Sequence, residues 1–365
     1  MKYHRVCIES FGYALPEQRV TTAELESRLT PLYRRLRLPE GRLELITGIE
    51  ERRFWPHGAS IGEQSARAGR LALAAAEFDP ARVGALIHGS VCRDHLEPAT
   101  ACKVHHQLGL PPGCVLYDVS NACLGLLSGI VQVANMIELR QIQAGLVVGC
   151  ESSRQVVEHT IETLNADTTL TRRSVKDSIA TLTLGSAACG VFVCDAEVSR
   201  TGNRLLGATA LANTRFHDLC QSGQDTAGAD MRPLMSTNSE KLMEEGIATG
   251  AKTFELFLQE HEISREQIDH TFAHQVGPTH HNRMYEALGL DPARDFTTMR
   301  WLGNTGAVAA PVTAAIGADQ GLIPDDPGGK RVALLGIGSG INCLMLLVDW
   351  RKSIVMHQGR LRRRR

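Results

Sequence analysis

The chain has 365 residues, enough for two domains or one large duplicated domain with a sizeable core. Its 39 Lys and Arg residues balance 40 Asp and Glu residues, and the formal net charge of -1 argues against nucleic acid and anionic membranes as partners. The N-terminus has no signal-peptide core and no run reaches the roughly 18 apolar residues of a membrane span. We therefore expect a cytoplasmic protein.

The predicted elements alternate between short apolar runs and longer amphipathic segments, which is typical of a mostly parallel sheet with helical crossovers. In chain order they are a helix at 65–78, a strand at 85–91, a helix at 128–140, strands at 143–150 and 188–195, a helix at 241–261 and a strand at 330–338. The sequence thus predicts an α/β protein.

The two halves of the chain repeat the same series of landmarks. Each half has a strand, a helix ending in "LGL", a turn that opens a small-residue helix, and a further strand; these are residues 83–91, 105–110, 115–134 and 143–153, then 268–276, 285–290, 295–317 and 330–340. A repeat this long indicates a duplicated domain rather than a solenoid. A pseudo-twofold axis would let "SNACLG" and "LGNTGA" face each other, so that catalytic residues from both halves meet.

The boundary between the copies is predicted near residue 200, in the polar "DAEVSRTGNR". This gives an N-terminal half at 1–200 and a C-terminal half at 201–350. Residues 214–240 are predicted to form a long loop or insertion, and residues 351–365, ending in "RLRRRR", a disordered basic tail.

Ten cysteines are scattered through the chain without a CxxC pair or a Cys/His cluster at zinc spacing, so we expect no metal. Most lie in apolar runs and are expected to be buried thiols in a reducing compartment. Cys123 differs, because in "DVSNACLGLLSGI" it stands where a polar turn meets a helix-like segment. A helix N-terminus stabilises a thiolate, so we predict a lowered pKa and a nucleophilic role. A structural cysteine is the alternative.

Two further polar residues are candidates for the same chemistry. His274 follows the strand-like "HTF", and residues at strand ends line the ligand crevice of α/β folds. Its imidazole can donate a hydrogen bond or carry a proton. The amide of Asn304, in "GNTGAVAAP", can donate to a developing negative charge, although alone this context favours a turn or helix N-cap. His280 and His281 are expected on a solvated helix face.

Together, a Cys, a His and an Asn indicate thiol-dependent acyl transfer, a trio that papain-type hydrolases share. The absence of a "CGSCW"-like sequence and the internal duplication argue against that fold. The segments "DVSNACLGLLSGI", "FAHQV", "GNTGAVAAP" and "LLGIGSGINC" instead resemble the thiolase-superfamily condensing enzymes of the ketoacyl synthase III type. The resemblance covers residues 5–350 and implies a duplicated, layered αβαβα fold, a homodimer and a Cys-His-Asn triad.

This resemblance also implies roles for individual residues. Cys123 would accept the acyl group as a thioester, while His274 and Asn304 would form the oxyanion hole for the second thioester. Backbone N–H groups of Cys123 and Ser339 would hold the first oxyanion. Arg52 and Arg53, in "TGIEERRF", are candidates to meet the phosphates of coenzyme A. Coenzyme A thioesters are the implied substrates, and no permanently bound cofactor is expected.

Within this family, "SVCRDHLEPATAC" and "LLGIGSGINC" are most similar to OleA-type enzymes, which condense acyl-CoAs at the start of bacterial olefin biosynthesis. In these enzymes the glutamate of the "LEP" turn reaches the partner subunit's active site, and the matching residue here is Glu97. Condensing two ordinary acyl-CoAs requires a base for the α-proton, and a desolvated carboxylate is a suitable one. Without the resemblance, Glu97 would be interpreted as a capping or salt-bridging residue. One departure is "GNTGA", which is more similar to ketoacyl synthase III.

The sequence therefore predicts non-decarboxylative Claisen condensation of two fatty acyl-CoAs to a β-keto acid or thioester. One alternative is a decarboxylating 3-oxoacyl synthase III that uses acyl-CoA and malonyl carrier protein. A second is an inactive scaffold that binds acyl chains, which the complete triad argues against. The expected partners are fatty acyl-CoA, a second copy of the chain, and either acyl carrier protein or downstream olefin-pathway enzymes.

Overall fold

The computed structural model describes residues 1–222 and 235–359. Its strands are β1 (Val6–Ala14), β2 (Gln18–Thr21), β3 (Glu51–Phe54), β4 (Ala85–Gly89), β5 (Val115–Val119), β6 (Ala144–Glu151), β7 (Ala187–Asp195), β8 (Arg204–Ala212), β9 (Cys220–Ser222), β10 (Met235–Thr237), β11 (His270–Ala273), β12 (Lys330–Gly338), β13 (Asn342–Trp350) and β14 (Val355–His357). Its helices are α1 (Thr22–Arg28), α2 (Thr30–Leu36), α3 (Arg42–Thr47), α4 (Ile61–Ala76), α5 (Thr100–Leu108), α6 (Gly125–Glu138), α7 (Arg154–Ala166), α8 (Lys176–Ile179), α9 (Ser239–His261), α10 (Pro278–Leu288), α11 (Met299–Leu302) and α12 (Ala309–Asp319).

The large sheet carries the duplication in its strand order, which is β11-β12-β13-β8-β1-β7-β6-β4-β5 with β14 beside β1. Strands β8, β13, β12 and β11 hold the places in the second half that β1, β7, β6 and β4 hold in the first. In each half, parallel pairs lie at the outer side and antiparallel pairs toward the centre. The duplicated α/β fold predicted from the repeat is confirmed. The predicted boundary near residue 200 falls between β7 and β8.

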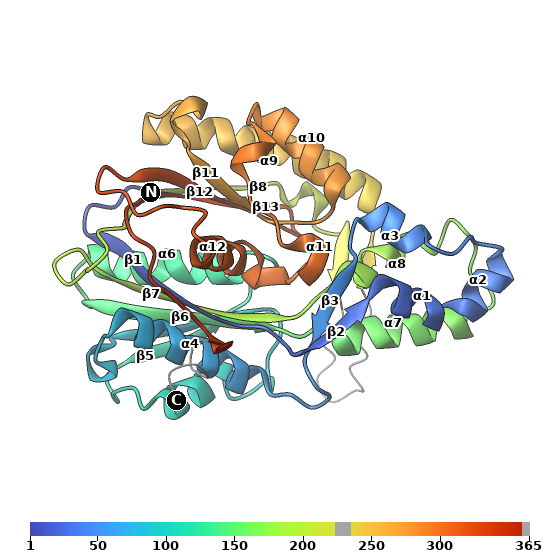
Figure 1. Ribbon diagram of the computed structural model, residues 1–365, viewed down its shortest axis with the longest axis horizontal. Helices are drawn as coiled ribbons and strands as arrows, with labels where there is room; N and C mark the ends of the chain where they lie inside the picture. The colour runs from blue at the N-terminus through green and yellow to red at the C-terminus, as the bar shows by residue number, and fades with distance from the viewer. Residues whose placement is uncertain (223–234, 360–365) are drawn as a thin grey trace.

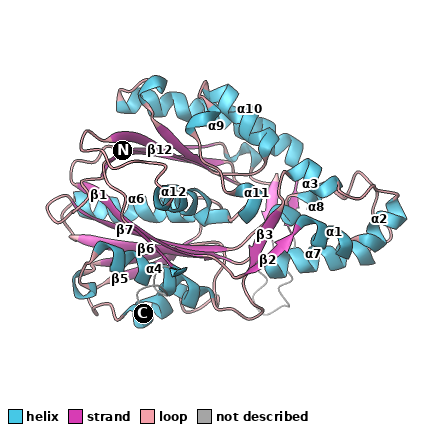
Figure 2. Ribbon diagram, viewed as in Figure 1, coloured by secondary structure: helices cyan, strands magenta, loops and turns pink. Residues whose placement is uncertain are grey.

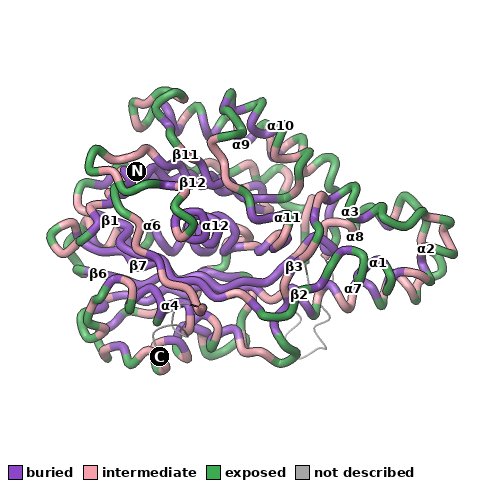
Figure 3. The backbone as a smooth tube through the Cα atoms, in the orientation of Figure 1, coloured by how far each residue is buried: buried purple, intermediate pink, exposed green. Residues whose placement is uncertain are grey.

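Five layers follow from this arrangement (Figure 1). Helices α6 and α12 lie between the two halves of the sheet, α4 and α5 cover one outer face, and α9 and α10 cover the other. Helix α4 packs on β1 and β7, while α9 packs on β8 and β13. The central α12 is buried throughout (Figure 3), since its alanine-rich sequence has no polar face. Small residues let α6 pack closely: a Cβ on Gly125 would lie 2.8 Å from the backbone of Gly89.

A projection at one end of the molecule was not predicted (Figure 2). It is formed by β2, β3, α1, α2, α3, α7 and α8 and has its own apolar cluster. The Thr21 and Glu24 side chains form a capping box that starts α1. Its helices are mostly short, so their apolar periodicity is weak in the sequence.

Two of the predicted irregular segments contain regular structure. Within 214–240, β9 and β10 pair antiparallel and α9 begins at Ser239, while residues 223–234 lie outside the described residues. The prediction of a tail from residue 351 was wrong for its first part, because β14 pairs in parallel with β1. The arginines at 360 and 362–365 lie outside the described residues. Within the described ranges, every helix is too short or too polar to cross a bilayer.

Candidate active site

Cys123 stands in the tight turn between β5 and α6, two residues before the helix begins. The Leu124 N–H donates to the Asn121 carbonyl at 2.8 Å, and Ala122 between them has a φ of 44°. This left-handed conformation is disfavoured for a residue with a Cβ, and such backbone strain is found mainly at functional sites. The turn thus presents Cys123 at the head of the central helix.

The pKa of the Cys123 thiol is not lowered by its place at the start of the helix. Burial, together with the nearby Glu151 and Cys220, raises the pKa of the Cys123 thiol to about 12. The prediction of a lowered pKa was wrong, because the sulfur is desolvated and faces a carboxyl group. At neutral pH the resting residue is a protonated thiol, so the proton must leave as sulfur attacks.

The glycine-flanked turn that contains Ser339 lies against Cys123. A Cβ placed on Gly338 would be 3.3 Å from the Cys123 backbone nitrogen, so the two backbones lie close together and a side chain at residue 338 would crowd Cys123. The amide of Asn342 also donates to the Asn121 side chain at 3.3 Å and ties the two turns together. The structure therefore places the Ser339 turn beside the nucleophile, where its role in an oxyanion hole remains a prediction.

Asn304 is fixed by its backbone on both sides. Its N–H donates to the Thr183 carbonyl at 2.9 Å, and its own carbonyl accepts from the Gly185 N–H at 2.8 Å. The side-chain Oδ1 accepts from the Gly306 N–H at 2.9 Å, which orients the amide and leaves Nδ2 as its donor. Thus the turn interpretation and the donor interpretation of Asn304 are compatible.

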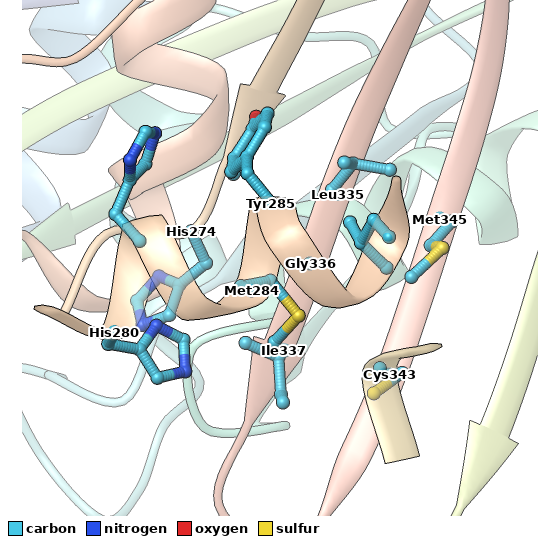
Figure 4. A pocket seen from close by; sticks show the side chains of 13 residues that line it. His274, His280, Met284, Tyr285, Leu335, Gly336, Ile337, Cys343 and Met345 are labelled. Atoms are coloured by element: carbon cyan, nitrogen blue, oxygen red, sulfur yellow. The ribbon is translucent and has the colours of Figure 1, made fainter. Parts of the chain in front are cut away.

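His274 follows β11 directly, and its N–H donates to the Leu335 carbonyl of β12 at 2.8 Å. Burial lowers the pKa of His274 to about 4, so the ring is neutral at physiological pH. The ring lines a small cavity between α10, β12 and β13, together with His280, Met284 and Ile337 (Figure 4). A neutral imidazole in this position can donate one hydrogen bond without carrying charge.

The expectation that His280 and His281 lie on a solvated helix face was wrong. Both line the same cavity as His274. His281 contacts the buried Asp295 at 2.8 Å through Nε2, and this partner raises the pKa of the His281 ring. Burial instead lowers the pKa of His280 to about 4.

A carboxyl group that the sequence reasoning missed, Glu151, lies at the end of β6 and joins the parts of the site. Its Oε1 accepts from the Ser90 hydroxyl and the Val91 N–H, both at 2.9 Å, and from the Ala307 N–H at 3.4 Å. Burial raises the pKa of Glu151. The signal available in the sequence was its place directly after a buried strand, in "VVGCESS".

Glu97 lies in the loop between β4 and α5, and its side chain is exposed in the single chain. Leu96 beside it is 49% exposed, and Val91 at the start of the loop is 46% exposed. Hydrogen bonds to Glu151 at Ser90 and Val91 anchor the root of this loop beside the Cys123 turn. The loop is therefore held near the site at one end and open to solvent at its tip.

The two arginines predicted to meet phosphates lie differently from each other. Arg52 is 0% exposed, and its guanidinium donates to the Thr22 hydroxyl and the Leu182 carbonyl. These bonds lie within the projection and its apolar cluster, so the assignment of Arg52 as a phosphate contact was wrong. Arg53 is partly buried and donates to the Pro16 carbonyl at 2.9 Å. Its role at a phosphate stays a prediction.

The candidate residues comprise a half-buried thiol, two neutral hydrogen-bond donors and a second backbone turn beside Cys123. These groups suit the stabilisation of oxyanions, and a thiol in a water-poor site suits acyl transfer. Among the described residues, no group of three or more His, Cys, Asp or Glu side chains is arranged to hold a metal ion.

Comparisons with known proteins agree with this geometry. Residues 55–198 match the family model "Thiolase, N-terminal domain", and residues 258–350 match the C-terminal model of 3-oxoacyl-[acyl-carrier-protein] synthase III. The chain is 44% identical over 354 residues to the acyl-CoA:acyl-CoA alkyltransferase of Shewanella oneidensis, which covers 96% of this chain and 100% of the relative. The enzyme of the same name from Xanthomonas campestris is 32% identical, over 96% and 100% of the two chains. The chain belongs to the acyl-CoA:acyl-CoA alkyltransferase family.

Solved structures of this family have the same fold. A crystal structure of Xanthomonas campestris OleA with bound lauric acid and lauroyl-CoA aligns with a TM-score of 0.88 at 31% identity, over 95% of this chain and 100% of that one. The 3-oxoacyl-(acyl carrier protein) synthase III FabH of Xanthomonas oryzae also aligns with a TM-score of 0.88, at 32% identity, over 96% and 100%. The protein is thus an OleA-like acyltransferase of the thiolase fold, as its sequence predicted.

Proposed function

We propose that this protein joins two fatty acyl-CoA molecules by non-decarboxylative Claisen condensation, through an acyl-Cys123 intermediate, to a β-keto acid or its thioester. The observation that carries the proposal is the likeness to acyl-CoA:acyl-CoA alkyltransferases over the whole chain. The geometry supports it, because the nucleophile, the donors and the loop that carries Glu97 are all anchored at one end of the parallel strands.

In the first step, the Cys123 sulfur attacks the thioester carbonyl of an acyl-CoA. The coenzyme A sulfur leaves and takes the thiol proton, so the high pKa of Cys123 leaves no unpaired charge in the resting site. The N–H groups of Cys123 and Ser339 hold the oxyanion, which the close approach of Gly338 to Cys123 favours. The product of this step is the acyl-enzyme.

In the second step, Glu97 of the partner subunit removes the α-proton of a second acyl-CoA. The resulting enolate oxygen is held by His274 and Asn304, and the enolate carbon attacks the carbonyl of the acyl-enzyme. Cys123 leaves, and a β-ketoacyl-CoA is formed, which hydrolysis converts to the β-keto acid. The neutral ring of His274 favours this role, since an oxyanion donor must keep its proton throughout the step.

A homodimer is part of the proposal. Strand β5 pairs only with β4 among the described residues, so one side of it is an open sheet edge. Val115 on this strand is 48% exposed, and the nearby loop exposes Val91 and Leu96. An open edge with apolar side chains favours pairing with another chain. A second copy there would place the Glu97 loop close to the dimer interface.

The proposal extends to substrate delivery and location. Arg53 remains a candidate for the coenzyme A phosphates, and a carrier protein or olefin-pathway enzymes are candidate partners. We place the protein in the reducing cytoplasm, which its ten unpaired cysteines support.

The test separates the two steps with Glu97→Ala. This variant is expected to acylate Cys123 at the wild-type rate, measured by intact mass, but to condense about 10² to 10⁴ times more slowly, the range of general-base catalysis. Glu63→Ala, which removes an exposed carboxylate on α4, is the control. Normal condensation by Glu97→Ala would refute the role of Glu97 as base.

Subunit mixing tests whether Glu97 acts across the dimer. Cys123→Ala and Glu97→Ala proteins are each expected to be inactive, but their heterodimer has one site with both groups. Mixing them is expected to restore part of the wild-type condensation activity. No recovery after subunit exchange, verified by native mass spectrometry, would assign the glutamate to its own subunit's site.

A further inference from the structure

One of the two ring nitrogens of His274 lacks a hydrogen-bond partner within the described ranges. Nδ1 is buried and has no hydrogen-bond partner among the described residues. His274 as a whole is 7% exposed. A buried polar atom without a partner costs about 1–3 kcal/mol, so a donor or acceptor is expected in the adjoining cavity.

The chemistry of His274 decides which kind of partner is needed. A neutral imidazole carries its proton on one nitrogen and accepts with the other. If His274 donates to the substrate oxyanion through Nε2, as the proposed function requires, Nδ1 must be the acceptor. The partner of Nδ1 must then be a hydrogen-bond donor.

Most side chains around the cavity cannot be that donor. The Tyr285 hydroxyl is 2.7 Å from the Thr271 hydroxyl, and His281 is held between Asp295 and Asn282. The other lining side chains are apolar or weakly polar, apart from His280; they are Ala273, Met284, Leu288, Leu335, Ile337, Cys343 and Met345. The donor must therefore come from His280 or from a small polar molecule held by it.

His280 is placed for this task. It lies in the first turn of α10, and Figure 4 shows its ring beside that of His274 at the same end of the cavity. His280 contributes, after burial, to the lowered pKa of His274, as expected of a close neighbour. The His280 ring itself makes no hydrogen bond to the side chain or backbone of another described residue. The cavity volume of ≈ 30 Å³ has room for a water molecule between polar groups.

We propose that His280 is a positioning residue that donates a hydrogen bond, through one bridging water, to Nδ1 of His274 and so fixes His274 in the Nε2–H tautomer. His280 does not touch the substrate. It ensures that the proton of His274 faces the reacting oxygen and not the cavity. This inference rests on the proposed role of His274 as an oxyanion donor.

The direct test is the tautomer of His274, read from ¹⁵N chemical shifts of the imidazole-labelled full-length protein at pH 7. The wild type is expected to show protonated Nε2 and an accepting Nδ1. In His280→Phe, which keeps a ring but removes both nitrogens, the Nδ1–H form is expected to appear. His280→Gln, which keeps an N–H donor, is expected to restore the wild-type spectrum. Thr279→Ala, an exposed neighbour on the same helix, is the control.

The kinetic test uses the same variants. His280→Phe is expected to slow condensation by a factor below the 10²- to 10³-fold cost of losing an oxyanion donor outright, with unchanged KM and unchanged acylation of Cys123. A wild-type tautomer in His280→Phe, or equal loss in His280→Gln and His280→Phe, would overturn the inference.

These outcomes also separate the inference from the function on which it rests. The Nε2–H tautomer in wild type, lost in His280→Phe, upholds the positioning role even if no acyl-CoA condensation is detected. Conversely, condensation by a wild type that holds His274 in the Nδ1–H form would uphold the condensation reaction, but it would refute both the donation through Nε2 and the role of His280.

Discussion

The two central helices, α6 and α12, occupy equivalent places in the two halves, yet the turns that precede them carry different chemistry. The turn before α6 carries Cys123, the proposed nucleophile, while the turn near the start of α12 carries Asn304, the proposed amide donor. Both helices are buried between the sheet halves. The duplication therefore creates two equivalent positions, one before each central helix. The residue at each position determines the chemistry proposed for that half.

Each of these turns is held by the opposite half of the molecule. Cys123, from the N-terminal half, lies against Gly338 in the turn before β13. Asn304, from the C-terminal half, is bonded on both sides to Thr183 and Gly185, in the turn before β7. The two turns that contact Asn304 and Cys123 each contain a Gly-Ser pair, at 185–186 and 338–339 respectively. The candidate site is therefore complete only when the two halves pack against each other. We expect activity to require this contact of each turn with the opposite half.

The largest effect is expected from removing the nucleophile of the N-terminal half. Cys123→Ala should abolish acylation and lower turnover by on the order of 10⁶, the typical cost of losing a nucleophile. Cys123→Ser should lose at least about two orders of magnitude, because a hydroxyl is a far weaker nucleophile near pH 7. Intact-mass spectrometry after addition of acyl-CoA checks both, with the exposed Cys102→Ala as the matched control. Acylation of another cysteine in the wild type would contradict the mechanism.

The equivalent change in the C-terminal half should affect the second step alone. Asn304→Ala removes the oriented amide and is expected to slow condensation by about 10² to 10³, the cost of one oxyanion donor. Acylation of Cys123 should continue, since that step uses the other turn. Single-turnover kinetics of the two steps distinguish them, and an equal loss in both would assign Asn304 to folding or to acylation.

Gly185 and Gly338 each contact the turn of the opposite half, and their replacement by alanine should have different effects on stability and on acylation. A Cβ on Gly185 would lie 1.8 Å from the Leu302 carbonyl oxygen, so Gly185→Ala is expected to cost about 1–3 kcal/mol or more of stability. Gly338→Ala would press on the Cys123 nitrogen at 3.3 Å and is expected to leave the melting temperature nearly unchanged while slowing acylation about tenfold. Calorimetry and acylation kinetics measure the pair. Normal acylation by Gly338→Ala would show that this contact is not needed.

The smallest expected effect concerns the reactivity of the thiol. A carboxylate near a thiol disfavours the thiolate, so Glu151 raises the pKa of Cys123, although burial raises it more. Glu151→Gln should therefore increase the rate of Cys123 alkylation by iodoacetamide at a fixed pH, by up to about tenfold for one pKa unit. An unchanged or slower rate would contradict the electrostatic coupling.

The duplication was predictable because it leaves a pattern in the sequence, and the same pattern marks the position of Cys123. Long apolar strands, small-residue helices and repeated turn motifs recur at matching places, and Cys123 follows a strand at a helix start. The family resemblance then placed His274 and Asn304 in the same site. The backbone of each is fixed by hydrogen bonds to residues far apart in the chain, and their shared role stays a prediction.

Other features could not be predicted, because they depend on contacts between distant segments. The pKa of Cys123 depends on burial by the second half and on Glu151, whereas the helix terminus alone favoured a thiolate. Arg52 looked like a surface arginine in a charged run, but the projection closes over it. Strand β14 is stabilised by its pairing with β1 rather than by its own short sequence.

The most direct test of the central claim is the product formed from one long-chain acyl-CoA, such as lauroyl-CoA, as the sole substrate. We predict that the wild type forms a β-keto acid or thioester, or the ketone left by its spontaneous decarboxylation, without any malonyl compound, as measured by mass spectrometry. Cys123→Ala should form none of these products. A wild type that acylates Cys123 but yields a condensed product only when malonyl carrier protein is added would contradict the account and identify a decarboxylating synthase.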